Sequence, residues 1–192
     1  MRLPCIEVPV ENSSWENERS HFCVGPNRPM RTLTRDECDR LIRRLRSVRP
    51  DTERQWGRMT AHQMVCHLAD VCRMAIGQVP VRDTSNALTR TIVKWVALYL
   101  PLRWRPGIVT SAEIDQCAGA GTRPGLFAAD VADVETLLTT LSTRGATAAW
   151  PAHPVFGPMS HSQWMRWAYL HTDHHLRQFR ATEEHGRTQA AE

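Results

Sequence analysis

Helix-start signals set the strongest limit on the fold: at three positions a Ser/Thr-x-x-Glu/Gln pattern stands before apolar residues at helical spacing. The three occurrences are Thr34-x-x-Glu37, Thr60-x-x-Gln63 and Ser160-x-x-Gln163. In such a capping box the hydroxyl accepts a hydrogen bond from the backbone N–H three residues later, and the Glu or Gln side chain reaches back to the first N–H. The pattern therefore predicts a helix start at each of the three positions.

Apolar spacing and breaker residues extend this prediction to five helices. The first is limited by Pro50, the second ends near Gly77, and the last runs to about Arg180. A fourth helix begins at Asp130 and is closed by Gly145. An extra helix over about 85–100 places one apolar stripe together, made of Leu88, Ile92, Trp95, Val96 and Tyr99.

No segment alternates long enough to predict a strand, and residues 101–127 are rich in proline and glycine. We therefore expect an all-α four-helix bundle with an extra helix and a long irregular loop. At 192 residues the chain has the size of one compact domain. We assign 1–29 to an N-terminal arm or tail, 30–184 to the bundle and 185–192 to a C-terminal tail.

Charge and cysteine usage restrict the partners and the compartment. A net charge of +4 is too small to imply nucleic-acid binding by itself, and the apolar run 91–102 is too short for a membrane span and contains Lys94 and Pro101. The six cysteines include no CxxC pair, which is typical of reduced thiols. We expect a cytoplasmic monomer or homodimer that binds a small-molecule substrate, without nucleic acid or membrane.

Two histidines of the predicted last helix suggest a metal site. His171 and His175 are four residues apart, so their imidazoles project from one helix face and can share an ion. Gln178, Trp164 and Trp167 lie on the same face. The pair alone is a weak signal, because solvated or hydrogen-bonded histidines produce the same spacing.

A third histidine strengthens the metal interpretation. His67 stands beside Met64, Leu68 and Val71 on the apolar side of the second helix. A histidine facing a core needs either a hydrogen-bonded neighbour or a metal, and both alternatives stay open. Three imidazoles plus an open position are the ligand set of catalytic zinc sites, and imidazole also suits nickel, iron and copper.

Cys66 directly precedes His67 and could be mistaken for a nucleophile of the same site. Successive residues of a helix point about 100° apart. We therefore predict that Cys66 is a small core residue.

The combined motifs resemble those of the DinB/YfiT-like superfamily of metalloenzymes, and most closely a branch known only as a domain of unknown function. The resemblance covers about residues 31–180. It is carried by Trp56-Gly57-x-Met59-Thr60, His67-Leu-Ala-Asp70, His153-Pro-Val-Phe-Gly-Pro-Met159 and His171-Thr-Asp-His174-His175-Leu-Arg-Gln178-Phe179.

The resemblance implies a four-helix bundle that binds one divalent metal ion, with His67, His171 and His175 as the ligands. By the same resemblance, Asp70 and Gln178 are catalytic supports that orient an imidazole or a metal-bound water. The substrate pocket is expected to include Trp164, Trp167, part of Trp95, Met64 and His174, the last in a supporting or dimer-surface role.

The same resemblance implies a thiol S-transferase that joins mycothiol, bacillithiol or glutathione to a small electrophile. The metal ion, which can be zinc, nickel or iron, would hold the thiolate. The chain has no HExxH motif to supply a hydrolytic base. One alternative is a metal-dependent hydrolase or isomerase/cyclase, and another is a helical binding module without metal chemistry.

Overall fold

The computed structural model describes residues 30–100, 104 and 110–181, and within them the chain is all-α, as predicted. The helices are α1 (Arg35–Arg46), α2 (Ala61–Ala75), α3 (Lys94–Tyr99), α4 (Phe127–Thr143) and α5 (His161–Gln178). A π-helical turn, Thr89–Val93, leads into α3, and two 3-10 turns, Ala112–Ile114 and Gln116–Ala118, precede α4. In this part of the chain the only β-type pairing is one isolated bridge between His153 and Gly157. The arm 1–29 and the tail 185–192 lie outside the described residues.

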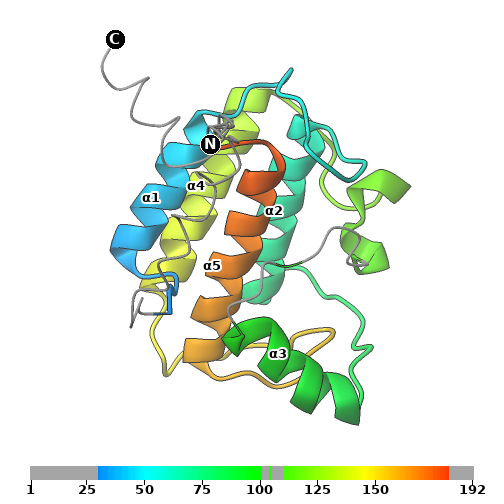
Figure 1. Ribbon diagram of the computed structural model, residues 1–192, viewed down its shortest axis with the longest axis vertical. Helices are drawn as coiled ribbons and strands as arrows, with labels where there is room; N and C mark the ends of the chain where they lie inside the picture. The colour runs from blue at the N-terminus through cyan, green and yellow to red at the C-terminus, as the bar shows by residue number, and fades with distance from the viewer. Residues whose placement is uncertain (1–29, 101–103, 105–109, 182–192) are drawn as a thin grey trace, which may run out of the picture.

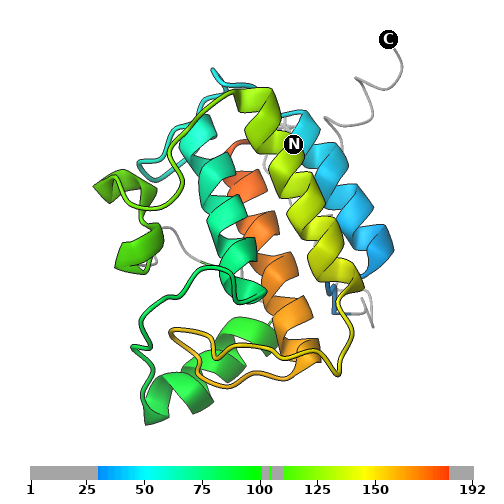
Figure 2. The same cartoon turned by 180° about the vertical axis from the view of Figure 1, so that it is seen from behind.

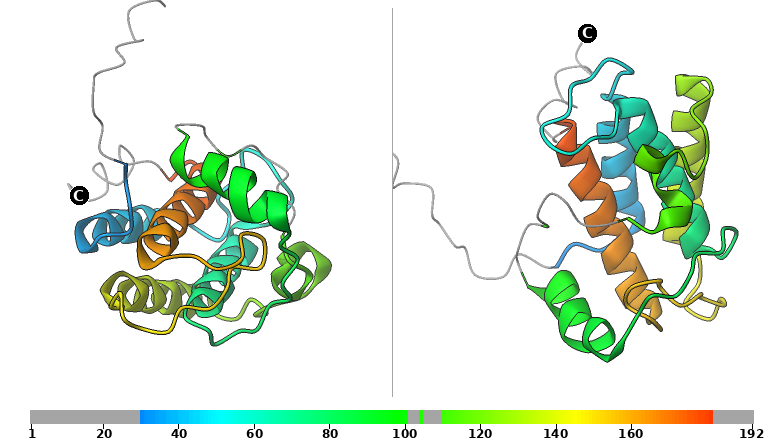
Figure 3. Two further views of the ribbon diagram at one scale, coloured as in Figure 1. Left: turned by 90° about the horizontal axis from the view of Figure 1, so that it is seen from below. Right: turned by 90° about the vertical axis from the view of Figure 1, so that its right-hand side faces the viewer.

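Four helices form the bundle, and α3 lies across one end of it (Figures 1 and 2). Helices α1 and α5 run in one direction, and α2 and α4 run in the opposite one. Each packs against two neighbours, in the cyclic order α1, α5, α2 and α4, which is visible in the view from below (Figure 3). Because α2 and α5 are neighbours, side chains of these two helices meet inside the bundle.

The capping residues explain where the helices begin. Thr60 and Ser160 form complete capping boxes with Gln63 and Gln163. The hydroxyl of Thr34 accepts from the backbone N–H of Glu37, but the Glu37 side chain bonds to Arg40 instead of reaching back. All three predicted starts are confirmed. Helix α4 begins earlier than predicted, at Phe127, and α5 ends at Gln178.

The core is formed by fully buried apolar side chains of the four bundle helices. Each bundle helix contributes such side chains, for example Leu45 from α1, Leu68 from α2, Leu138 from α4 and Leu176 from α5. Burying a side chain of this size contributes about 1.5–3 kcal/mol. The Arg44 side chain is also buried, and it joins α1 to α5 through an ion pair with Asp173 at 2.7 Å.

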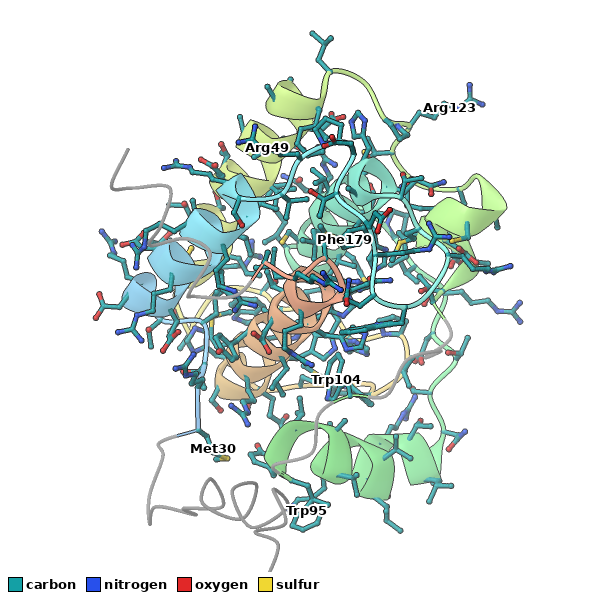
Figure 4. The ribbon with its side chains drawn as sticks, turned by 45° about the horizontal axis from the view of Figure 1, so that its top comes forward. Met30, Arg49, Trp95, Trp104, Arg123 and Phe179 are labelled. Carbon is teal, nitrogen blue, oxygen red and sulfur yellow. The ribbon has the colours of Figure 1, made fainter. Side chains whose placement is uncertain are left out.

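The apolar stripe predicted within residues 88–99 does not face the core of the bundle. Leu88, Ile92 and Trp95 are 57%, 61% and 56% exposed, whereas Leu98 is fully buried. Most of the stripe therefore shares the exposed side of its helix, and Trp95 does not take the place in a substrate pocket that the sequence predicts for it. Figure 4 shows Trp95 on the outer side of this helix, away from the bundle.

The 3-10 turns Ala112–Ile114 and Gln116–Ala118 pack against α2 on the side away from α1 (Figure 3, right). Between them the Asp115 carboxylate accepts from the backbone N–H groups of Cys117 and Ala118. Among the described residues no helix combines the length and the apolar character that a membrane crossing requires.

Candidate metal centre

The three predicted ligands meet between α2 and α5. His67 comes from α2, and His171 and His175 come from α5 one turn apart. The Nε2 atoms of His67 and His171 are 3.2 Å apart, and each of the three imidazoles has a ring nitrogen within 4.8 Å of the others. The ring centroids of His67 and His175 are 4.9 Å apart. The site therefore consists of three converging imidazoles.

Hydrogen bonds on the far side of two rings orient them. Nδ1 of His67 lies 3.2 Å from the backbone oxygen of Ile114, and Nδ1 of His175 lies 2.9 Å from Oε1 of Gln178. Both oxygens accept, so Nδ1 carries the proton in each ring, and Nε2 has a lone pair available. This arrangement is the one commonly found around metal-bound histidines.

Gln178 is held in place from its other end. Its Nε2 donates to the backbone oxygen of Trp56 at 2.7 Å. Gly57 has a φ of +81°, and a Cβ there would lie 2.5 Å from Nε2 of Gln178. Position 57 thus requires glycine for two reasons: its backbone has a positive φ, and Gln178 approaches it too closely for a Cβ.

Burial keeps the three imidazoles neutral. It lowers the pKa of His67, His171 and His175 because desolvation disfavours the imidazolium ion, and for His171 and His175 the neighbouring imidazoles lower it further. Metal binding requires neutral imidazole. The low pKa values therefore favour coordination at neutral pH.

The geometry fits a divalent ion. Two imidazole nitrogens that each lie about 2.05 Å from one tetrahedral ion are about 3.3 Å apart, close to the 3.2 Å between His67 and His171. The part of the chain that the structure describes adds no fourth histidine, cysteine, aspartate or glutamate to this group. The donor set is that of a site with an open position.

Asp70 lies in α2 close to His67 in sequence, but it holds a loop. Its carboxylate accepts from the Thr122 backbone N–H at 2.9 Å, from the Thr122 hydroxyl at 2.5 Å and from Nε2 of Gln116 at 3.0 Å. The loop it anchors carries Ile114, whose oxygen orients His67. Asp70 therefore acts on the imidazole through the loop, and its oxygens are already used by these donors.

Aromatic rings surround the three histidines, and they are only partly the predicted ones. The Trp167 ring lies 4.8 Å from that of His171. His174 is buried between Trp56 and Trp104, at centroid distances of 5.8 and 6.1 Å. Figure 4 shows Trp104 beside α5. The sequence motif contained Trp56 without giving it a role, and Trp104 stood in a segment without a recognisable pattern.

The other predicted pocket residues are buried in the core. Trp164 is fully buried, and its ring packs on Trp150, His153 and Trp167. Met64 is fully buried in the core on α2. Their place in a substrate pocket stays a prediction.

A second group of potential ligands, which the sequence analysis did not identify, lies on another face of α2. Nε2 of His62 is 2.6 Å from Oδ2 of Asp130, and Sγ of Cys66 is 3.8 Å from the same oxygen. Cys66 is buried as predicted, and burial together with the Asp130 charge raises the pKa of its thiol to about 12. A raised pKa disfavours the free thiolate that a nucleophile needs. The i, i+4 spacing of His62 and Cys66 was the available signal.

Comparison with known proteins gives a family but no activity. The sequence pattern of the family described as "Protein of unknown function (DUF1569)" matches residues 27–182. The search of the curated proteins and the search of the solved structures each found no match.

Proposed function

The chain belongs to the DUF1569 family, and from its site we propose that it is a metal-dependent enzyme in which His67, His171 and His175 hold one divalent ion. Zinc, nickel and iron all suit this donor set. The observation that carries the proposal is the convergence of three neutral imidazoles, of which His67 and His175 are buried and His171 is half-buried. His67 and His175 also have Nδ1 engaged by outer partners. Hydrogen bonding alone would not require three such groups to face one another.

The proposed reaction is the transfer of a low-molecular-weight thiol, such as mycothiol, bacillithiol or glutathione, to a small electrophile. When bound, the ion would act as a Lewis acid and bind the thiol as its thiolate. The chain itself orients His67 through Ile114 and orients His175 through Gln178. The resemblance to the DinB/YfiT-like superfamily favours the same chemistry.

The absence of a carboxylate partner supports thiol transfer over hydrolysis. In the described part of the chain, no Asp or Glu side chain hydrogen-bonds to any of the three imidazoles, and Asp70 is occupied by Thr122 and Gln116. Many metal-dependent hydrolases use a carboxylate as the general base for water, and among the described residues this site has no free carboxylate for that role. A thiol that is ionised on binding needs no such base.

The surrounding aromatic rings would receive the electrophile. Trp167 and Trp104 both contact the His171 ring, at centroid distances of 4.8 and 5.9 Å. His174 and Trp56 extend this surface. These side chains favour a substrate with an apolar part and few charges.

The first test is the metal content of the untagged protein, with His171→Ala beside the wild type. We expect about one ion per chain that depends on His171. His161→Ala is the matched control, since His161 lies in the same helix and its ring packs on Trp150. An equal metal content in wild type and His171→Ala, or none in either after reconstitution with zinc, nickel and iron, would contradict the proposal.

The second test measures thiol and electrophile together in the metal-loaded protein. Glutathione and mycothiol are offered with the general thiol probe monochlorobimane. We expect thiol and probe to disappear in equal amounts in the wild type and in His161→Ala, and at background rate in His171→Ala. Loss of the electrophile without thiol consumption would replace transfer by hydrolysis or isomerisation at the same site.

A further inference from the structure

We propose that His62, Cys66 and Asp130 form a second metal site, at the contact between α2 and the first turn of α4, that takes zinc or another thiophilic divalent ion. Nε2 of His62, Sγ of Cys66 and a carboxylate oxygen of Asp130 all lie within 4.8 Å of one another. The proposal is independent of the function proposed for the three histidines.

The helices bring the three ligands together in a regular way. His62 and Cys66 are one turn apart on α2 and therefore share a face of that helix. Asp130 lies in the first turn of α4, where its Oδ2 accepts from the backbone N–H of Gly125 at 2.9 Å. Helices α2 and α4 pack side by side along their length (Figure 2). The backbone thus holds all three ligands close to their places.

The donor atoms and their distances suit a tetrahedral ion. Imidazole, thiolate and carboxylate are the three ligand types that zinc takes in proteins. Around such an ion a nitrogen and an oxygen ligand are about 3.4 Å apart, and a sulfur and an oxygen about 3.6 Å. The observed distance between Nε2 of His62 and Oδ2 of Asp130 is 2.6 Å and would have to increase by about 0.8 Å. The distance between Sγ of Cys66 and the same oxygen is 3.8 Å and would have to decrease by about 0.2 Å. Side-chain rotation of His62 can supply the larger change.

Partial exposure gives an ion access to this cluster. The side chains of His62 and Asp130 are 20% and 21% exposed, whereas Cys66 lies beneath them. A water molecule can therefore complete the coordination. The cluster is separate from the three histidines, because Cys66 and His67 are successive residues of one helix and point in different directions.

Binding is an exchange of a proton for the ion and involves no electron transfer. The S–H bond of Cys66 breaks, its proton leaves to solvent, and the sulfur lone pair binds the ion. The Nε2 proton of His62 moves to Nδ1 of the same ring, so that a neutral imidazole binds the ion through the Nε2 lone pair. The ion keeps its oxidation state throughout.

The test is a cobalt(II) titration of the full-length, reduced, untagged protein after chelation of bound metals. A thiolate ligand gives cobalt(II) a charge-transfer band in the near ultraviolet, and a site of three imidazoles does not. We expect the band in the wild type and two cobalt ions per chain. Cys66→Ser is expected to lose the band and one ion. Cys72→Ser and Cys117→Ser, at a buried and an exposed cysteine, are expected to keep both.

Two further variants separate this site from the three-histidine site. His171→Ala is expected to keep the charge-transfer band, so failure of the proposed function would leave this result intact. Asp130→Asn keeps an oxygen that can accept from Gly125 but is a poorer ligand, and we expect at least about 10-fold weaker cobalt binding in the band titration. Circular dichroism checks that each variant is folded. A wild type without the band, or a folded Cys66→Ser that retains it, would overturn the proposal.

Discussion

Helix α2 contributes to two groups of potential metal ligands, and they differ in what their donor atoms face. In the buried group, the Nδ1 atoms of His67 and His175 are engaged by Ile114 and Gln178, and Nε2 of His67 lies at hydrogen-bond distance, 3.2 Å, from Nε2 of His171. In the half-exposed group, Nε2 of His62 is hydrogen-bonded to Asp130, which is itself a ligand candidate.

This difference predicts different affinities. The buried group is arranged for an ion by its outer contacts, and the 3.2 Å between Nε2 of His67 and Nε2 of His171 is already close to the spacing around a tetrahedral ion. In the half-exposed group the 2.6 Å between His62 and Asp130 must first widen. Outer contacts typically change metal affinity by about 10–100-fold. We therefore expect the three-histidine site to bind a given divalent ion more tightly. The predictions below test this contrast, from the largest effect to the smallest.

The largest effect is expected for Asp70→Ala, which removes the anchor of the loop behind His67. The change leaves two Thr122 donors and one Gln116 donor without their buried acceptor, so we expect a loss of about 3 kcal/mol in the free energy of unfolding. Urea unfolding with chelator present measures it. Asp133→Ala, which removes a partly exposed partner of Arg73, is the control and should cost less than about 1 kcal/mol. Equal costs for the two variants would contradict the anchoring role.

Gln178→Leu is expected to weaken metal binding at the three histidines by about 10–100-fold, because Nδ1 of His175 loses its acceptor. Gly57→Ala should act in the same direction, since the new Cβ would displace Nε2 of Gln178. Competition with a chromogenic chelator measures the affinity. The thiolate-to-cobalt band is the internal control and should not change in either variant. Unchanged affinity in both variants would show that Gln178 does not prepare the site.

Burial around the centre also predicts a pH dependence of stability. Burial lowers the pKa of His153, whose ring packs on Trp167, to about 3. Below its ordinary pKa of 6.5, His153 is protonated in the unfolded chain but stays neutral in the folded one. Its contribution to the free energy of unfolding is therefore fully present above pH 6.5 and is lost progressively as the pH falls toward 3. From about pH 7 to about pH 5.5 this residue accounts for a loss of about 1 kcal/mol.

His153→Phe should reduce the pH dependence by that amount. The variant also loses the Nδ1 acceptor for the backbone N–H groups of Val155 and Phe156, so its stability at neutral pH will be lower. The relevant quantity is therefore the difference between the two pH values, from urea unfolding with chelator present. The same difference in wild type and variant would argue against a neutral, buried His153.

The smallest effect is expected for His62→Ala without metal. The His62–Asp130 pair is partly exposed, so its removal should cost only about 0.5–1 kcal/mol. With excess zinc the difference in free energy of unfolding between wild type and variant should increase, because an ion that binds only the folded state stabilises it. A difference that stays the same with and without zinc would leave this group as an ordinary ion pair.

Much of the fold follows from local sequence signals. The capping boxes at Thr60 and Ser160 locate two helix starts because the hydrogen bonds involved span only three residues. The extra helix shows where such reasoning fails, since the apolar stripe that includes Ile92 and Trp95 is exposed and Leu98 is buried. Which face of a helix is covered depends on the elements that pack against it. Here the π-helical turn also shifts the angular positions of the residues that follow it around the helix axis.

That His171 and His175 share a face of one helix follows from their spacing, because i, i+4 geometry is local. Only the tertiary structure decided that His67 from α2 reaches the same point, and that Ile114 and Gln178 set the orientation of two of the rings. It alone also brought Asp130 to His62 and Cys66. The physical reason is that contacts between elements depend on how helices and loops pack. Spacing along one helix specifies the direction of a side chain but not what it will meet.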